Sequence, residues 1–251
     1  MPAVYACICP GSLVPTEAPG TAAALDRVRE ELGGCAPETV VLVLVRERGA
    51  PGVVTAESVR RDAGSLQADP ELAERTMAEA AHAGLRAETV RHWDGDGGSP
   101  AFPWLDDTLA GARLMAVAAS RSSRRQSFDF GRALGRALEA HDRRVALVCG
   151  VGLARARDHA SRGADERAAR MFDDHYQRAL ERWDVKWMVQ GDDELRHRVA
   201  EDAVAQTAVL MGALSGYRIT PRVLSHETPD GAGCLVAAID VLGLRRKQRA
   251  E

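Results

Sequence analysis

The residues that could perform chemistry lie in short polar or glycine-rich segments that directly follow apolar runs of the sequence. Such runs predict buried strands, and ligands of a parallel sheet bind at the carboxyl ends of its strands. The segments are Pro10-Gly11-Ser12, Arg46-Glu47-Arg48-Gly49, Cys149-Gly150-Val151-Gly152 and Ser225-His226-Glu227. A fifth candidate is the glycine-rich stretch His92–Gly98. We therefore expect a small-molecule site where these segments meet.

Two of these segments carry side chains that could bind a cation or exchange a proton. His226 and Glu227 follow a predicted strand and precede the turn at Pro229, so we expect Glu227 to point toward the cleft. Asp94 and Asp96 offer carboxylate oxygens, which hard divalent cations prefer, and an exposed surface loop is the other interpretation. Four more histidines fall on predicted helices or at their ends, where we expect no ligands: His82, His141, His175 and His197.

Known sequence signatures narrow the chemistry further. Gly150 and Gly152 follow a strand, as in a dinucleotide-binding fingerprint, but Arg155 stands where the third glycine belongs, which favours a simple tight turn. The chain has no P-loop, zinc-protease or serine-hydrolase signature. Its five cysteines include no C-x-x-C pair, which argues against a disulfide framework or a zinc ribbon. Cys7 and Cys9 would share one face of a strand, where buried thiols are commoner than metal ligands.

Composition indicates a globular protein. The 251 residues include 33 Lys and Arg against 36 Asp and Glu, a formal net charge of −3. That balance does not indicate nucleic-acid or membrane-surface binding. No apolar run reaches the roughly 18 residues of a membrane span, and the N-terminus lacks the basic start of a signal peptide. We therefore expect a cytoplasmic protein with no nucleic-acid and no membrane partner.

Strand-like and helix-like segments alternate along the chain and predict an α/β fold, an α/β/α sandwich around a mostly parallel sheet. Strands are expected at Val4–Cys9, Thr39–Val45, Arg113–Ala119, Arg144–Cys149, Tyr217–Leu224 and Cys234–Val241. Helices are expected at Thr21–Leu32, Pro70–Gly84, Phe128–His141, Ala164–Trp183 and Glu201–Ser215. No linker or repeat divides the chain, so we expect one domain over residues 1–244 and a solvated basic tail over 245–251.

Several of these segments, in order, resemble the class III extradiol ring-cleavage dioxygenases of the subunit-B type, which include the Memo-like proteins. Gly131–Leu138 and the strand Val145–Cys149 resemble the helix and strand before the family's SGDLSH motif. Pro221–Ala237 is similar to its C-terminal YE-x-P-x-G-x-G segment. Ala6–Pro10 resembles the strand before the family's PHPP motif, and Thr39–Val45 resembles the strand before its second PH motif. Trp93–Leu105 resembles its DHG loop.

The resemblance implies an iron site that this sequence has largely lost. In that family two histidines and one glutamate hold Fe(II), and a further histidine acts as acid and base. Carried over by position, the first ligand falls on Gly11, the second on Arg46 or a neighbour, and the DHG histidine on Gly97. The acid–base histidine falls on Arg155 or a neighbour, and the glutamate alone remains, as Glu227.

These replacements argue against ordinary extradiol cleavage, because glycine has no donor atom and arginine stays protonated. We therefore expect no metal cofactor. The alternative is Fe(II) or another divalent cation in a relocated site, for which the candidate residues are His92, Asp94, Asp96, His226 and Glu227.

Three functions remain open: a pseudoenzyme or ligand-binding protein, a repurposed enzyme for an aromatic or carboxylate-bearing metabolite, and a dioxygenase with displaced ligands. Glu227 and Arg155 are the expected catalytic residues, and we expect Glu227 to pair with Arg46 or Arg155 in place of the lost dication. Three aromatic residues could wall an aromatic pocket or could equally belong to the core: Trp93, Phe102 and Trp104. The expected ligand-binding residues are Gly11, Ser12, Arg46, Asp96, Trp104 and His226. The resemblance also implies a homodimer.

Overall fold

A computed structural model describes residues 3–11, 18–55, 67–91, 111–154, 162–191, 193–199 and 201–245 of the chain. It shows a single sheet with the strand order β5-β3-β6-β2-β7-β1-β9-β8, in which β4 also pairs with β6. The strands are β1 Ala3–Pro10, β2 Thr39–Arg46, β3 Gly52–Val54, β4 Gln67–Ala68, β5 Glu88–Val90, β6 Arg113–Ser120, β7 Val145–Val151, β8 Tyr217–Glu227 and β9 Cys234–Leu244. The mixed, mostly parallel α/β fold expected from the sequence is confirmed.

The centre of the sheet is parallel and buried on both faces. β2 pairs with β6 and with β7, and β7 pairs with β1, all in parallel. Their residues are almost entirely buried apolar side chains, as in β7, which is buried throughout. Continuous runs of this kind fit strands covered by helices on both sides, because neither face alternates with water.

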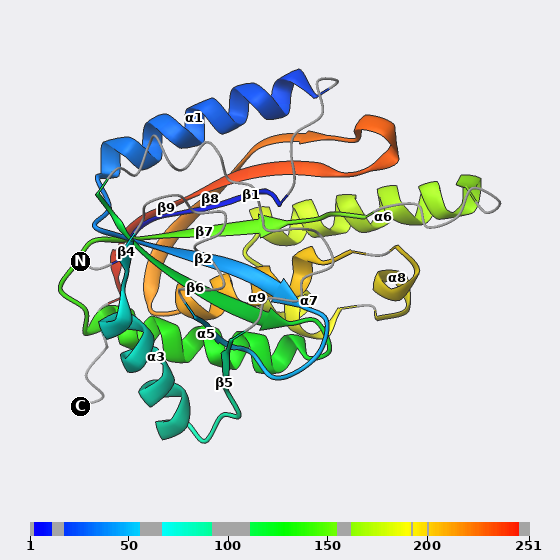
Figure 1. Ribbon diagram of the computed structural model, residues 1–251. Helices are drawn as coiled ribbons and strands as arrows, with labels where there is room; N and C mark the ends of the chain where they lie inside the picture. The colour runs from blue at the N-terminus through cyan, green and yellow to red at the C-terminus, as the bar shows by residue number, and fades with distance from the viewer. Residues whose placement is uncertain are drawn as a thin grey trace, which may run out of the picture.

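Helices cover the two faces of the sheet (Figure 1). They are α1 Pro19–Cys35, α3 Pro70–His82, α5 Arg124–Glu139, α6 Arg162–Glu181, α7 Val185–Gln190, α8 Asp193–Arg198 and α9 Ala203–Ala213. α1 lies on one face above β1, β8 and β9, and α3, α5 and α9 lie on the other. α5 and α9 pack closely because Gly131 has no side chain: a Cβ there would lie 2.2 Å from the Val209 carbonyl oxygen.

Several short elements were not predicted from the sequence. β3, β4 and β5 have two or three residues each, too few for periodicity to reveal them. α7 and α8 have six residues each and interrupt the stretch after α6. α5 begins at Arg124 rather than at Phe128 because its polar first turn is capped by Ser123, whose Oγ accepts the Gln126 amide.

Strand directions bring distant segments to one edge of the sheet, which we call the carboxyl edge. β1, β2, β6 and β7 all end there, after Pro10, Arg46, Ser120 and Val151. β9 runs antiparallel to β1, and β8 antiparallel to β9, so β8 also ends there, at Glu227. β3 runs antiparallel to β6, and β5 is parallel to β3, so β5 starts at this edge with Glu88.

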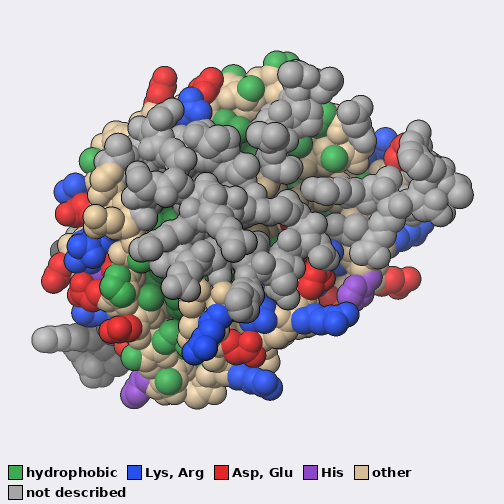
Figure 2. Space-filling model, viewed as in Figure 1, with side chains coloured by type: hydrophobic (Ala, Val, Ile, Leu, Met, Phe, Trp, Pro, Cys, Tyr) green, Lys and Arg blue, Asp and Glu red, His purple; other side chains and the backbone are tan. Residues whose placement is uncertain are grey.

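The described surface carries interspersed charges. Acidic and basic side chains alternate along the rim of the face shown in Figure 2.

The first residue of the basic tail, Arg245, is bound at the start of β8. It donates its amide to the Gly216 carbonyl oxygen and its Nε to the Tyr217 carbonyl oxygen. Among the described helices, none has the length and apolar character of a bilayer span.

Candidate functional site at the carboxyl edge

Glu227 binds the N-terminus of helix α1. Its Oε1 accepts the Gly20 amide at 3.2 Å, and its Oε2 accepts the Thr21 amide at 2.5 Å and the Thr21 hydroxyl at 2.7 Å. The first turn of a helix leaves amides without partners, and α1 has no side-chain cap of its own at Ala18. Glu227 therefore caps α1 from a strand 207 residues away in the sequence. The hydroxyl and amide of Thr21, followed by the amide of Gly20, lower the pKa of Glu227.

Arg46 lies at the same edge but does not pair with Glu227. Its Nη1 binds Glu88 Oε2 at 2.9 Å and the Ala50 carbonyl oxygen at 3.3 Å. Gly49 has φ +98°, and a Cβ there would meet the Arg46 guanidinium at 2.6 Å, so glycine allows the arginine to fold over this turn. The prediction of an Arg46–Glu227 pair is therefore wrong, because each group has a nearer partner. The hydrogen bond from Arg46 lowers the pKa of Glu88.

His226 contacts helix α6 instead of a metal-ligand set. Its Nδ1 lies 3.1 Å from Gln177 Oε1, and its Nε2 lies 3.7 Å from Asp173 Oδ2. Asp173 is buried and accepts the Ala154 amide through Oδ1 at 3.2 Å. Sequence reasoning missed Asp173 and Gln177. Their four-residue spacing on one helix face was the only available signal, and it names no partner.

The exits of β1 and β7 are joined by backbone and buried polar contacts. The Gly11 amide donates to the Val151 carbonyl oxygen at 2.9 Å. Gly152 donates its amide to Asp202 Oδ1, and a Cβ at Gly152 would lie 2.7 Å from that oxygen. Gly152 is thus explained by the approach of Asp202, which agrees with the absence of a complete dinucleotide fingerprint.

A further cluster closes the exits of β2 and β6. Arg121 binds Glu47 through Nη1 and the Glu201 carbonyl oxygen through Nη2 at 2.7 Å. Arg124 is buried and binds Asp193 Oδ1 at 2.7 Å. Burial, followed by the positive charge of Arg196, lowers the pKa of Arg124 against the opposing effect of Asp193. These arginines each have a carboxylate partner, so the cluster is close to electrically balanced.

Several predicted site residues lie outside the described part of the chain. They are Ser12, His92, Asp94, Asp96, Gly97, Trp104 and Arg155. Their roles stay predictions, as does the pairing of Arg155 with Glu227. Of the expected site residues that the structure describes, Gly11, Arg46, His226 and Glu227 all lie at the carboxyl edge.

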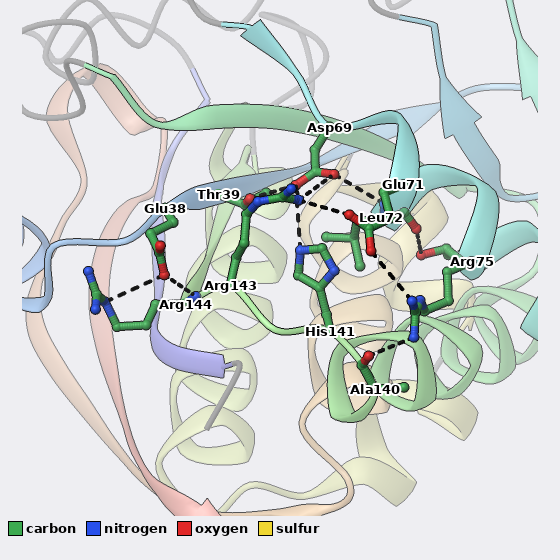
Figure 3. Close-up of polar contacts among 11 residues, drawn as sticks. Glu38, Thr39, Asp69, Glu71, Leu72, Arg75, Ala140, His141, Arg143 and Arg144 are labelled. Atoms are coloured by element: carbon green, nitrogen blue, oxygen red, sulfur yellow. Dashed lines mark hydrogen bonds and ion pairs between the residues drawn. The ribbon is translucent and has the colours of Figure 1, made fainter.

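The opposite edge, where the parallel strands begin, holds a second histidine–aspartate pair (Figure 3). Asp69 caps α3 by accepting the Leu72 amide at 3.2 Å, and it accepts the Thr39 hydroxyl at 2.6 Å. Arg143 Nη1 lies 3.3 Å from Asp69 Oδ2, and His141 Nε2 lies 3.5 Å from the same oxygen. This carboxylate joins the start of β2, the start of α3 and the segment before β7.

Comparison with known proteins identifies the family. Residues 25–237 match the family described as the catalytic LigB subunit of aromatic ring-opening dioxygenase. The chain belongs to this family. This LigB-family chain also resembles the crystal structure of uncharacterized protein JW3007 from Escherichia coli K12, with a TM-score of 0.59 and 14% sequence identity. The alignment covers 94% of this chain and 99% of the other, which supports the fold. No curated protein matched the chain.

The described residues of this LigB-family protein do not fit the iron site that the resemblance implies. Gly11 offers no donor atom, and Arg46 is a cation bound to Glu88. Glu227 has both oxygens occupied by donors of α1. Within the described ranges, no group of three or more His, Cys, Asp or Glu side chains is placed to hold a metal ion. We therefore derive no step through Fe(II).

Proposed function

We propose that this divergent LigB-family protein binds a small anionic or aromatic ligand at its carboxyl edge, as a pseudoenzyme or repurposed binding protein, and does not cleave aromatic rings. One observation carries the proposal: Glu227, the glutamate expected from the family, caps helix α1 instead of facing an open coordination position. A carboxylate that already accepts three hydrogen bonds is a poor metal ligand, because binding a cation would strip donors from the helix.

Arg46 is the best-supported anion-binding group among the described residues. Its Nε is buried and has no hydrogen-bond partner within the described ranges, while Nη1 already holds the carboxylate of Glu88. A guanidinium can bind a carboxylate through two parallel donors, and here one internal carboxylate uses only Nη1. Glu88 thus occupies part of Arg46 as a ligand's carboxylate would, and a competing carboxylate ligand would take its place.

Binding of benzoate, cyclohexanecarboxylate and phenol, measured by isothermal titration calorimetry, tests the proposal. Benzoate carries both a carboxylate and an aromatic ring. Cyclohexanecarboxylate has the carboxylate without the aromatic ring, and phenol has the aromatic ring without the carboxylate. We expect Arg46→Met to weaken benzoate binding by roughly tenfold or more, the value of one charge-assisted hydrogen bond. We expect Glu88→Gln to strengthen it, because the guanidinium is released.

Matched control variants exist at the other edge of the sheet, where Arg144 and Glu38 form an exposed ion pair. Arg144→Met and Glu38→Gln should leave binding of all three probes unchanged. Absence of benzoate binding to the wild-type protein contradicts the proposal. So does benzoate binding that Arg46→Met and Arg144→Met affect equally.

A further inference from the structure

Two arginines beside the carboxyl edge lie beneath the surface and share one carboxylate. Arg124, the first residue of α5, and Arg196, on α8, have side chains that are 7% and 10% exposed. Arg124 Nη2 donates to Asp193 Oδ1 at 2.7 Å, and Arg196 Nη1 donates to the same oxygen at 3.0 Å. The two guanidiniums are therefore close neighbours, and their positive charges repel each other.

The charge balance of this arginine pair depends on a surface residue. Glu201 is buried, and its Oε1 binds Arg196 Nε, while its Oε2 accepts the Val204 amide at 2.9 Å and caps α9. Among the described contacts of the pair, one buried carboxylate thus faces two buried guanidiniums. The second negative charge comes from Asp193, whose side chain is 64% exposed. Buried ions need a compensating charge, and here an exposed side chain that can turn away into solvent supplies it.

Arg124 also has an unused donor. Its Nη1 is buried and has no hydrogen-bond partner within the described ranges. Its Nη2 is shared between Asp193 Oδ1 and the Gly191 carbonyl oxygen, which lies 2.9 Å away. The two terminal nitrogens form the guanidinium edge that binds an oxyanion through two parallel hydrogen bonds, and Asp193 engages only one of them. A buried donor without a partner is unfavourable, so a ligand that used this edge fully would gain binding energy.

We propose that Arg124 and Arg196 form a binding site for a tetrahedral oxyanion of the phosphate class, in which the Asp193 carboxylate stands in for the ligand. A phosphate group presents oxygens in three directions, so it can accept both terminal nitrogens of Arg124 and Nη1 of Arg196 at once. A planar carboxylate serves only one guanidinium edge in this parallel way. The bound anion displaces the Asp193 carboxylate into solvent. This site uses none of the groups of the Arg46 site and goes beyond the function proposed above.

Isothermal titration calorimetry with inorganic phosphate, at an ionic strength held constant with sodium chloride, tests the site. Asp193→Asn keeps the shape of the side chain and removes its competing charge, so we expect phosphate to bind roughly tenfold more tightly than to wild type. The matched control is Asp26→Asn, which removes a similarly exposed carboxylate from the Asp26–Arg29 pair on α1 and should leave the affinity unchanged. Absence of phosphate binding to Asp193→Asn overturns the proposal, and so does an equal gain in both variants.

Two further measurements define the bound group. Arg124→Lys keeps the charge but lacks the planar fork, so it should weaken phosphate binding by roughly tenfold, and an unchanged affinity would contradict the proposed geometry. Because position 193 is exposed, Asp193→Asn decides the proposal even where Arg124→Lys does not fold. Methyl phosphate separates the two sources of this chemistry: an affinity equal to that of inorganic phosphate assigns a phosphate ester, and a weaker affinity assigns the free anion.

Failure of this site and failure of the proposed function can be distinguished. Benzoate binding reports on Arg46, whereas phosphate binding reports on Arg124 and Arg196. Glu88→Gln, which releases Arg46, should not reproduce the gain in phosphate affinity that we expect from Asp193→Asn. An equal gain in these two variants would place the phosphate elsewhere and contradict the two-arginine site, whatever the benzoate titration shows.

Discussion

Two histidine–aspartate pairs, each with a buried aspartate, lie at opposite edges of one sheet, and their hydrogen bonding differs. Asp69 lies at the edge where the parallel strands begin, which we call the amino edge. It accepts the Thr39 hydroxyl and the Leu72 amide. It also contacts His141 and Arg143. Asp173, at the carboxyl edge, accepts the Ala154 amide through Oδ1, and its Oδ2 faces His226 without a hydrogen-bond partner among the described residues. The two side chains are equally inaccessible, with exposed fractions of 0% and 2%. Burial alone therefore does not determine their behaviour.

The difference appears in the ionisation of the two aspartates. Burial opposes ionisation of Asp69, but donation from Thr39 and Leu72, with the charges of His141 and Arg143, outweighs it and lowers the pKa. Burial of Asp173 is not outweighed, and its pKa is raised. A fully satisfied carboxylate is typical of a structural anchor. An under-satisfied one destabilises the fold, and such groups concentrate at functional edges.

The same substitution should have opposite effects at the two positions. Asp69→Asn places an amide NH₂ among the donors of Thr39, Leu72 and Arg143, so we expect a loss of about 2 kcal/mol in the free energy of unfolding. Asp173→Asn should cause no loss. Urea denaturation of both variants at pH 7 measures the contrast, and equal losses would show that the two pairs are equivalent.

Removal of the Glu227 cap should have a smaller effect that remains local to helix α1. Glu227→Gln turns one acceptor oxygen into an amide that faces the donors of Gly20 and Thr21. We expect a lower melting temperature and faster amide exchange at Thr21, with Leu72 exchange unchanged because Asp69 still caps α3. Unchanged exchange at Thr21 would mean that this capping contact contributes nothing.

The smallest expected effect is the pH dependence of stability at each pair. The folded pKa of Asp69 lies below its ordinary value of 3.8, so its contribution is complete above that pH and disappears as the pH falls through the folded value. For Asp173 the folded pKa lies above 3.8, so stability decreases as the pH rises from 3.8 through the folded value.

Difference curves isolate these two contributions. The stability of wild type minus that of Asp69→Asn should rise with pH in acidic solution. The stability of wild type minus that of Asp173→Asn should fall with pH. Thermal unfolding from pH 3 to pH 9 gives both curves, and slopes of the same sign would contradict the assigned shifts.

The sequence predicted the centre of the sheet well for a clear physical reason. Val40–Val45 and Val145–Val151 are continuous apolar runs, which are typical of strands buried on both faces. The same reasoning placed Arg46, His226 and Glu227 at strand ends, where the structure has them. Short strands such as Gly52–Val54 were missed because three residues carry no periodicity.

The partners of the site residues could not be predicted. Glu227 contacts Thr21 across 206 residues, and His226 contacts Gln177 across 49. Neither separation leaves a local pattern in the sequence. The prediction that Arg46 would replace the lost dication was electrostatically sound, but Glu88 enters the same edge on β5, a strand too short to predict. Charge arguments from the sequence correctly indicated that Arg46 and Glu227 need partners. They could not indicate which residues those partners are.

The central claim is that the carboxyl edge of this protein no longer binds iron. Anaerobic Fe(II) binding tests it most directly, and it can be measured by isothermal titration calorimetry and by iron analysis after desalting. The comparison needs wild type, Glu227→Gln and the amino-edge control Glu38→Gln. Our account predicts far less than one equivalent of retained iron in all three proteins, because Glu227 caps helix α1. One equivalent retained by wild type and by Glu38→Gln, but absent from Glu227→Gln, would contradict it.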